Sequence, residues 1–268
     1  MESLVGKVAV VTGGSFGLGL SLCRHLLAEN FVVLACGRTE ERLMWAAKAL
    51  PGLRTLAADI TEPSHRDRLF DAIEDIGMPV DLFVNNAAVS RAHDYTDDFT
   101  LEADQARQEI ETNFIAPVEL IRRFLALRRA KGQEAHPATI ANVSTPAALF
   151  SAEANPIYSS SKAGFHFFTS SLRRQLADTA VRVVEIFPPA LDTGLVTDLS
   201  IPGIERNGPE VIDEVARRSV EGIFAGDPVI LPHPLSKALV EAVGDAAERL
   251  ADKVNPTVRR RDGWQSTR

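Results

Sequence analysis

Short runs of apolar, mostly β-branched residues alternate with longer segments of helical spacing along most of the chain, and this rhythm constrains the fold most strongly. The runs are continuous, which is typical of strands buried on both faces of a parallel sheet. Strands that alternate with helices indicate right-handed crossovers and an α/β fold with one doubly wound parallel sheet of about seven strands, flanked by helices. The predicted strands are 7–11, 31–36, 54–58, 81–84, 138–143, 182–187 and 229–231.

Neither a repeat nor a linker divides the chain, so we expect a single domain over residues 1–252, followed by a basic tail over 253–268. Long helices are predicted over 102–131 and 158–177, where apolar residues recur at helical spacing. The segment of about 194–227 is rich in glycine, proline and charge, and we predict that it forms a lid over one end of the sheet.

Composition excludes several classes of function. The 268 residues are 45% hydrophobic and 24% charged, as expected for a globular chain, and the net charge of −7 argues against nucleic acid as a partner. No apolar run approaches the ~20 residues that span a bilayer. We therefore expect a cytoplasmic protein that does not bind membranes. Cys23 and Cys36 are predicted to be core residues, and no metal is predicted because histidine and cysteine lack metal-binding spacing.

A glycine-rich turn, Gly13-Gly14-Ser15-Phe16-Gly17-Leu18-Gly19, follows the first predicted strand and opens a helix. Such a turn brings backbone N–H groups close to an anion, and the helix N-terminus adds partial positive charge, so a diphosphate is the expected ligand. The same residues match the G-x-S-x-G nucleophile elbow of hydrolases. Only twelve residues precede Gly13, too few for the strands that come before that elbow. A tight turn without a ligand is the alternative on this motif alone.

Three motifs in order resemble the short-chain dehydrogenase/reductase family: Thr12-Gly13-x-x-x-Gly17-x-Gly19, Asn85-Asn86-Ala87-Ala88 and Tyr158-x-x-x-Lys162. Residues 188–193 and the helix around 109–117 resemble its DltE-like branch. The resemblance covers roughly residues 5–193. It implies a Rossmann-type domain, a nicotinamide cofactor, and hydride transfer involving a small-molecule carbonyl or alcohol.

The resemblance also implies which nicotinamide cofactor is bound. Gly37 takes the position of the aspartate that NAD-specific members use, and Arg38 follows it, so NADP(H) is favoured over NAD(H). Ser15 and Phe16 stand where many NADP-preferring relatives have a second basic residue. The alternative is that Arg38 is an idle surface residue of an NAD-dependent alcohol dehydrogenase. The predicted cofactor contacts are Gly13, Ser15, Phe16, Gly17, Leu18, Gly19, Gly37, Arg38, Thr39, Asp59, Ile60, Asn86, Ala87, Ala88, Tyr158, Lys162, Pro188, Leu191 and Thr193.

Some of these contacts have roles that the resemblance specifies. Asp59 is expected to accept from the adenine amino group while Ile60 packs on the ring, and a helix N-cap at Asp59 is the alternative. The Leu191 backbone and the Thr193 hydroxyl are expected to meet the nicotinamide carboxamide.

Tyr158 and Lys162 lie four residues apart and share one helix face. A free tyrosine has a pKa near 10, and a nearby ammonium lowers that pKa, so Tyr158 is the predicted acid and base. The family's carbonyl-binding hydroxyl, thirteen residues earlier, falls on Thr145, which we rank ahead of Ser144. Asn113 resembles the family's helix asparagine, which orients Lys162 in a proton relay. An exposed asparagine without a role is the alternative.

The predicted substrate side lies at the carboxyl ends of the strands and includes His93, Tyr95, Phe150 and Val196. The resemblance implies a homodimer or homotetramer through the paired long helices, to which the phenylalanines at 165, 167 and 168 contribute unless they are core residues. These observations predict an NADP(H)-dependent carbonyl reductase or alcohol dehydrogenase. A non-catalytic nucleotide-binding scaffold or sensor is the alternative from another class.

Overall fold

A computed structural model describes residues 6–91, 103–152, 154–193 and 207–243. Its seven strands form one sheet in the order β3-β2-β1-β4-β5-β6-β7, and every neighbouring pair is parallel. The strands are β1 (Val8–Thr12), β2 (Val32–Gly37), β3 (Arg54–Ala57), β4 (Val80–Asn85), β5 (Ala138–Val143), β6 (Val181–Ile186) and β7 (Val229–Ile230). The predicted doubly wound sheet is confirmed, and each strand falls within two residues of its expected bounds.

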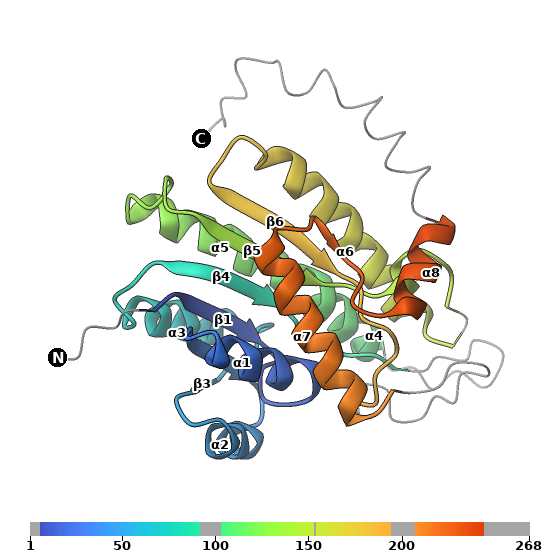
Figure 1. Ribbon diagram of the computed structural model, residues 1–268, viewed down its shortest axis with the longest axis horizontal. Helices are drawn as coiled ribbons and strands as arrows, with labels where there is room; N and C mark the ends of the chain where they lie inside the picture. Colours follow the sequence, from blue (N-terminus) through green and yellow to red (C-terminus); the bar gives the residue numbers. More distant parts are fainter. Residues whose placement is uncertain (1–5, 92–102, 153, 194–206, 244–268) are drawn as a thin grey trace.

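Helices follow the strands and cover both faces of the sheet (Figure 1). They are α1 (Gly17–Ala28), α2 (Glu40–Ala49), α3 (Pro63–Glu74), α4 (Ala103–Ile110), the π-helical turn η1 (Glu111–Ile115), α5 (Ala116–Ala130), the 3₁₀ turn η2 (Pro146–Ala148), α6 (Pro156–Gln175), α7 (Pro209–Ala225) and α8 (Pro234–Val243).

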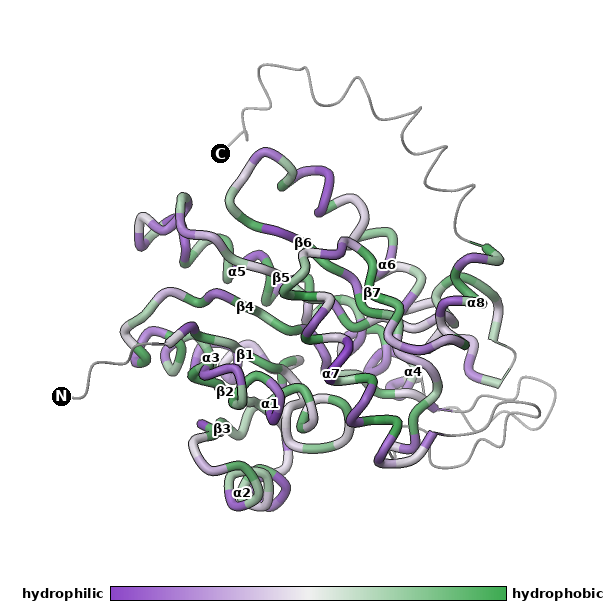
Figure 2. The backbone as a smooth tube through the Cα atoms, in the orientation of Figure 1, coloured by the Kyte–Doolittle hydropathy of each residue, from purple (hydrophilic) through white to green (hydrophobic). Residues whose placement is uncertain are grey.

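Two apolar cores result, one on each face of the sheet. The first core packs α1, α2 and α7 against the sheet, and the second packs α3, α5 and α6 against the other face. In Figure 2 the central strands are coloured largely as apolar residues, in keeping with their burial. This layering places loops at the carboxyl edge of the sheet, where α/β folds of this type bind ligands.

The prediction of a lid over about 194–227 is wrong in its second half. Residues Pro209–Ala225 form α7, which packs beside α1 and buries Val215, Ala216 and Val220 in the first core. Gly226 ends the helix with a φ of 80°, the left-handed C-cap conformation that glycine adopts without strain. The charged residues from 210 to 221, together with Gly222 and Gly226, therefore belong to a core helix and its cap. Residues 194–206 of the predicted lid and the 253–268 tail lie outside the described residues.

The single long helix predicted over 102–131 is also corrected. It is divided into α4 and α5 by η1, a turn with i→i+5 geometry. Such π turns are rare and are frequent at functional sites. The predicted burial of Cys23 and Cys36 is confirmed, since both are free thiols in the interior. Among the described residues, no helix is long and apolar enough to cross a membrane, and no cluster of three or more metal-binding side chains occurs.

Candidate active site

Thr12 ties the end of β1 to the end of β4 and so assembles the floor of the site. Its hydroxyl accepts from the backbone N–H groups of Asn86 and Ala87, at 3.0 and 3.1 Å, and donates to Val84 O. The Asn86 side chain returns a hydrogen bond to Thr12 O at 2.9 Å and another to Gly13 O at 3.2 Å. The 85–88 motif and the glycine turn are therefore one hydrogen-bonded unit. Thr12 was part of the quoted motif, but its role as this hub was not predicted.

Close backbone approaches explain the glycines of the turn. Gly13 has a φ of 66°, and a Cβ there lies 2.9 Å from the Ala87 Cα. Gly17 has a φ of 54°, and a Cβ there lies 2.8 Å from the Thr193 side chain. A Cβ on Gly19 collides with the Gly13 carbonyl oxygen. The turn thus lies at van der Waals distance from the segments that follow β4 and β6, and these positions have no room for side chains.

The N-terminus of α1 opens into this turn. Phe16 is its N-cap residue and supplies no side-chain hydrogen bond, and the first turn contains no acidic residue. The first N–H groups of a helix have no intrahelical partner, and the helix dipole places partial positive charge there. This geometry suits a diphosphate, the group that the motif predicts.

Two contacts bring the end of β2 against the same turn. A Cβ on Gly37 lies 2.9 Å from Ser15 Oγ, so an acidic side chain at position 37 requires Ser15 to move. Arg42 of α2 places its guanidinium carbon 5.3 Å from the centre of the Phe16 ring, a cation–π contact. Arg38 and Thr39 are exposed beside these contacts. The sequence did not predict Arg42 as a site residue.

The segment after β3 contradicts the alternative of a helix N-cap, and the predicted adenine contact stays a prediction. Asp59 does not cap a helix, because Glu62 is the N-cap of α3. Instead Asp59 Oδ1 accepts from the Thr61 backbone N–H at 2.9 Å and from the Thr61 hydroxyl at 2.7 Å. Ile60 is 6% exposed and packs within the second core, which leaves little of its side chain for a ring.

A cavity of about 580 Å³ lies next to this Asp59–Thr61 segment and extends towards α4. Its lining residues are Thr61, Ala106, Arg107, Gln108, Ile110 and Glu111.

Tyr158 and Lys162 lie on the first turns of α6, which starts at Pro156 with Asn155 as N-cap. Tyr158 is 9% exposed and Lys162 is 2% exposed. Lys162 Nζ donates to Val143 O at the end of β5, at 2.8 Å. Burial lowers the pKa of Lys162 to about 8, against an opposing effect of the Glu185 carboxylate. The Lys162 ammonium is therefore fixed at the edge of the sheet and releases its proton more readily than a free lysine does.

Burial also raises the pKa of Tyr158 to about 12, while a hydrogen bond with the Thr145 side chain lowers it and the charge of Glu109 raises it. The hydroxyl of Thr145 also accepts from Ala147 N at 3.3 Å. Ser144 Oγ, in contrast, is buried and has no hydrogen-bond partner among the described residues. Of the two candidate hydroxyls, Thr145 is the one that contacts Tyr158.

Asn113 lies in η1 and is 1% exposed, so the alternative of an exposed asparagine without contacts is wrong. Its side chain accepts from Val89 N at 2.9 Å and donates to Val89 O at 2.8 Å. It also donates to Ser161 Oγ at 3.0 Å, and Ser161 donates to Tyr158 O at 2.7 Å. Asn113 thus joins the loop after β4 to the turn of α6 that carries Tyr158. Ser161 was not predicted.

The segment after β6 closes the site on the glycine turn. Pro188 is buried, Leu191 forms a β-bridge with Asn207, and the Thr193 N–H donates to Leu191 O at 2.9 Å. These contacts hold Thr193 against Gly17. The predicted cofactor residues from β1, β4 and β6 are therefore neighbours. Leu18, by contrast, is 7% exposed and packs in the first core.

The substrate predictions are only partly covered. Phe150 follows η2 and is 41% exposed. His93, Tyr95 and Val196 lie outside the described residues. Phe165 is buried in the second core, Phe168 is partly buried against it, and Phe167 is 62% exposed. The alternative that all three phenylalanines are core residues is therefore wrong for Phe167.

The residues present fit a dinucleotide. Gly13, Gly17 and Gly19 let the turn lie directly against the ends of the neighbouring segments, and α1 begins there without a side-chain cap or an acidic residue in its first turn. Small residues at 86–88 line the next strand end, with Tyr158 and Lys162 beyond them.

Comparison with known proteins places this arrangement in a family. The family model described as short chain dehydrogenase matches residues 7–201. The uncharacterized oxidoreductase DltE of Bacillus subtilis is 34% identical over 195 residues, which cover 72% of this chain and 74% of DltE.

Solved structures share the fold. A short chain dehydrogenase from Burkholderia cenocepacia in complex with NADP has a TM-score of 0.74 at 23% identity, covering 94% of this chain and 98% of that one. A short chain dehydrogenase/reductase from Burkholderia phymatum in complex with NAD has a TM-score of 0.75 at 20% identity, covering 95% and 97%. With its profile match, its similarity to DltE and its parallel sheet, the chain belongs to the short-chain dehydrogenase/reductase family of oxidoreductases.

Proposed function

We propose that this chain is an NADP(H)-dependent oxidoreductase that interconverts a ketone or aldehyde with its alcohol, with Tyr158 as acid and base. One observation carries the proposal: a buried tyrosine and a buried lysine ammonium share one helix face at the carboxyl edge of the sheet, where Lys162 bonds to the end of β5. Burying the Lys162 ammonium costs free energy that an apolar side chain would not, so a role besides packing is expected for it.

The roles of the side chains follow from their contacts. The bound nicotinamide supplies or accepts the hydride. Tyr158 gives its proton to the carbonyl oxygen during reduction and takes it back during oxidation. Thr145, which hydrogen-bonds to Tyr158, donates to the same oxygen. Lys162 places positive charge beside Tyr158, which favours the phenolate and counters the effect of burial.

The preference for NADP(H) is supported by the contacts around the end of β2. Position 37 is a glycine and so lacks the acidic side chain that NAD-specific members use there. Arg38 is exposed there, and Arg42 over Phe16 supplies a second cation near the turn, where Ser15 and Phe16 replace the usual basic residue. Glu40 and Glu41 in the first turn of α2 oppose this charge in part. The structural neighbours described above bind NADP and NAD respectively, so the fold alone does not choose.

The proposed substrate is a small-to-medium carbonyl compound or alcohol, and the proposed assembly is a homodimer or homotetramer. Phe167 supports the assembly, because it is a large apolar side chain 62% exposed on α6. Sedimentation of the wild type and of Phe167→Glu tests it, and a monomer in both contradicts it.

The first experiment is a titration of the purified protein with NADPH and with NADH, read by nicotinamide fluorescence. Tighter binding of NADPH by tenfold or more, which is about 1.4 kcal/mol, is expected, and Arg38→Asp should reduce it. Equal or NADH-favoured binding contradicts the NADP preference and supports an NAD-dependent alcohol dehydrogenase.

The second experiment is a carbonyl screen with the preferred cofactor, on the wild type and on Tyr158→Phe. Loss of the phenolic proton is expected to lower kcat by about 10²–10⁴-fold while cofactor affinity stays within about threefold. Thr145→Ala and Ser144→Ala form a matched pair, and the larger loss is expected for Thr145. Cofactor binding without turnover on any carbonyl points to a nucleotide-binding scaffold instead.

A further inference from the structure

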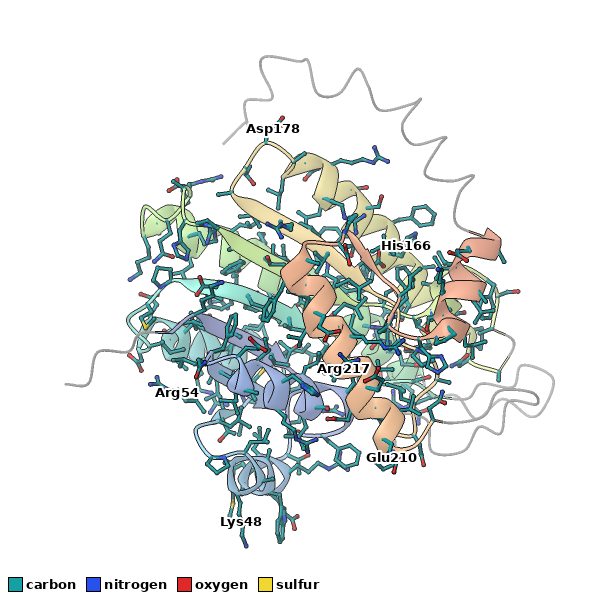
Figure 3. All side chains as sticks on the ribbon, viewed as in Figure 1. Lys48, Arg54, His166, Asp178, Glu210 and Arg217 are labelled. Atoms are coloured by element: carbon teal, nitrogen blue, oxygen red, sulfur yellow. The ribbon has the colours of Figure 1, made fainter. Side chains whose placement is uncertain are left out.

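A buried carboxylate beneath α6 has no part in the proton transfer described above. Glu185 of β6 has a side chain that is 1% exposed. His166, labelled in Figure 3, comes from α6. Its Nδ1 lies 3.0 and 3.1 Å from the two Glu185 oxygens, and an Arg173 nitrogen lies 3.9 Å from one of them. A carboxylate at such depth is costly unless it is paired, and even a paired one rarely adds stability over apolar residues. A role besides packing is therefore worth seeking.

Three basic side chains of this region share one face of α6. Lys162, His166 and Arg173 are separated by four and seven residues, which places them along a single stripe of the helix. This stripe lies over β6, where Glu185 is in register with Asn142 of β5. Lys162 Nζ bonds to Val143 O, the next residue of β5. The Lys162 ammonium is thus held one strand away from Glu185 and one residue further along the sheet, and the carboxylate acts on it electrostatically without an ion pair between the two among the described residues.

We propose that Glu185, oriented by His166, is a positioning residue that keeps Lys162 charged beside Tyr158. The inference rests on the proposed function, because a charged Lys162 matters only if Tyr158 moves a proton. The carboxylate acts through Lys162 and has no contact with Tyr158 among the described hydrogen bonds. His166 holds it against the helix, and the ring of His166 in turn packs edge-on against Phe187, with centroids 5.7 Å apart.

In the described part of the chain, the other charged groups near Lys162 and Glu185 lie on α4 and α6. Glu109 of α4 is fully buried and acts on Tyr158, where its charge raises the pKa of the phenol. Arg173 lies further along α6 and donates its Nε to Val183 O. β4 and β5 present the neutral side chains of Asn85 and Asn142, joined by a hydrogen bond of 2.9 Å. Glu185 is thus the negative group that acts on Lys162, and no other charge is assigned to that effect.

The decisive measurement is the titration of the Lys162 side chain by ¹³C NMR in the cofactor-free protein. Its signal is assigned as the one that disappears in Lys162→Arg. Its pKa is about 8 in the wild type. In Glu185→Gln the pKa is expected to fall by about one or more, because burial then acts without its counter-charge. Glu221→Gln is the matched control, since Glu221 pairs with Arg217 on the exposed surface of α7 and should leave Lys162 unchanged.

Kinetics supply the second measurement. If the ammonium is required for reduction, kcat falls as pH rises through the pKa of Lys162. We call this fall the alkaline limb of the pH profile. Glu185→Gln is expected to move the limb to a pH about one unit lower, which is about a tenfold lower hydroxide concentration. His166→Phe keeps the carboxylate but removes its hydrogen-bond donor, and is expected to shift the limb in the same direction by less. Glu185→Asp retains the charge and should restore the wild-type limb in part, which a packing role does not predict.

The outcomes separate this inference from the proposed function. An unchanged Lys162 titration in a folded Glu185→Gln overturns the inference, even if Tyr158-dependent turnover is found. A shifted titration without carbonyl turnover in the wild type leaves the electrostatic link intact and overturns the proposed function. If Glu185→Gln does not fold, His166→Phe carries the same test, and its unchanged titration contradicts the proposal.

Discussion

The turn that joins β1 to α1 is shaped by missing side chains, whereas the face of α6 that meets the sheet is filled with polar ones. Gly13, Gly17 and Gly19 bring three backbone segments into direct contact. On α6, in contrast, Tyr158, Lys162 and Ser161 each bury a polar atom and hydrogen-bond with the protein around it. The first region holds its shape by close approach and the second by satisfied hydrogen bonds and paired charge.

This difference teaches how each region tolerates change. A backbone contact of the turn has no spare room, because any added atom must displace a main chain. A substitution in a polar network removes one partner, and the group left behind stays buried without its hydrogen bond. Substitutions in the turn should therefore abolish cofactor binding, while those on the α6 side should reduce activity by differing amounts.

The largest effect is expected for Gly19→Ala. Its Cβ collides with the Gly13 carbonyl oxygen and crowds the Asn86 side chain, so we expect a loss of about 3 kcal/mol or more in unfolding free energy and loss of cofactor binding. Gly164→Ala is the control, because its Cβ meets only the Phe114 ring at 3.9 Å. That variant is expected to be neutral or more stable by about 0.4–1 kcal/mol. Urea unfolding measures both, and equal effects would remove the distinction between the two regions.

The second test compares one polar hub from each region. Thr12→Val leaves the N–H groups of Asn86 and Ala87 unpaired, and Asn113→Ala leaves the backbone N–H and C=O of Val89 unpaired. Each is expected to lower the unfolding free energy by about 2–4 kcal/mol. Only Thr12→Val is expected to weaken NADPH binding, and only Asn113→Ala to lower kcat at saturating cofactor. Thr12→Ser, which keeps the hydroxyl, should behave as the wild type. Loss of affinity in both variants would show that the regions act as one.

The two regions are also expected to respond to alkaline pH with opposite signs. Burial raises the pKa values of Cys23 and Cys36 to about 12, so above pH 9 the unfolded chain loses protons first and stability falls. Burial lowers the pKa of Lys162 to about 8 from 10.5, so between these values the folded protein loses its proton first and stability rises. Tyr158, with a pKa raised to about 12, adds to the fall only above pH 10.

The window from pH 8 to 9 therefore isolates Lys162. Its contribution is expected to approach ~1.4 kcal/mol per pH unit at most, and Lys162→Met should remove it. The double variant Cys23→Ala, Cys36→Ala should keep the rise below pH 9 and lessen the fall above it. Urea unfolding at half-unit steps of pH measures the difference profiles, and parallel profiles for all three proteins contradict the assignment.

Local signals sufficed for most of the fold. The apolar runs predicted every strand because a parallel sheet buries both faces, and β5 has its predicted bounds of 138–143. The error at α7 was avoidable, since Ile212, Val215, Ser219 and Ile223 recur at helical spacing before a glycine C-cap. The π turn at Asn113 could not be predicted. A helical turn that holds one extra residue uses the same residue types as an ordinary α-helical turn, so the sequence carries no signal for it.

The site was predictable where a motif fixes it and not where distant residues meet. The spacing of Tyr158 and Lys162 places them on one helix face in any α-helix. The contact of Gly17 with Thr193 joins residues 176 positions apart in sequence, and the pairing of His166 with Glu185 depends on how α6 lies over β6. Such contacts follow from the tertiary arrangement, and no local pattern indicates them.

The smallest expected effect sharpens the comparison at the edge of the glycine turn. Phe16→Leu removes the ring beneath Arg42, a cation–π contact of about 0.5–1 kcal/mol at an exposed site. If Arg42 helps to hold the 2′-phosphate, the Kd for NADPH should rise about two- to fivefold, while that for NADH stays unchanged. Trp45→Leu is the matched control, because it removes the contact of Lys48 over Trp45, at 5.4 Å, on the same helix. A rise in both Kd values in Phe16→Leu would mean that Phe16 shapes the turn itself. Phe16 would then tolerate substitution as poorly as the glycines on either side of it.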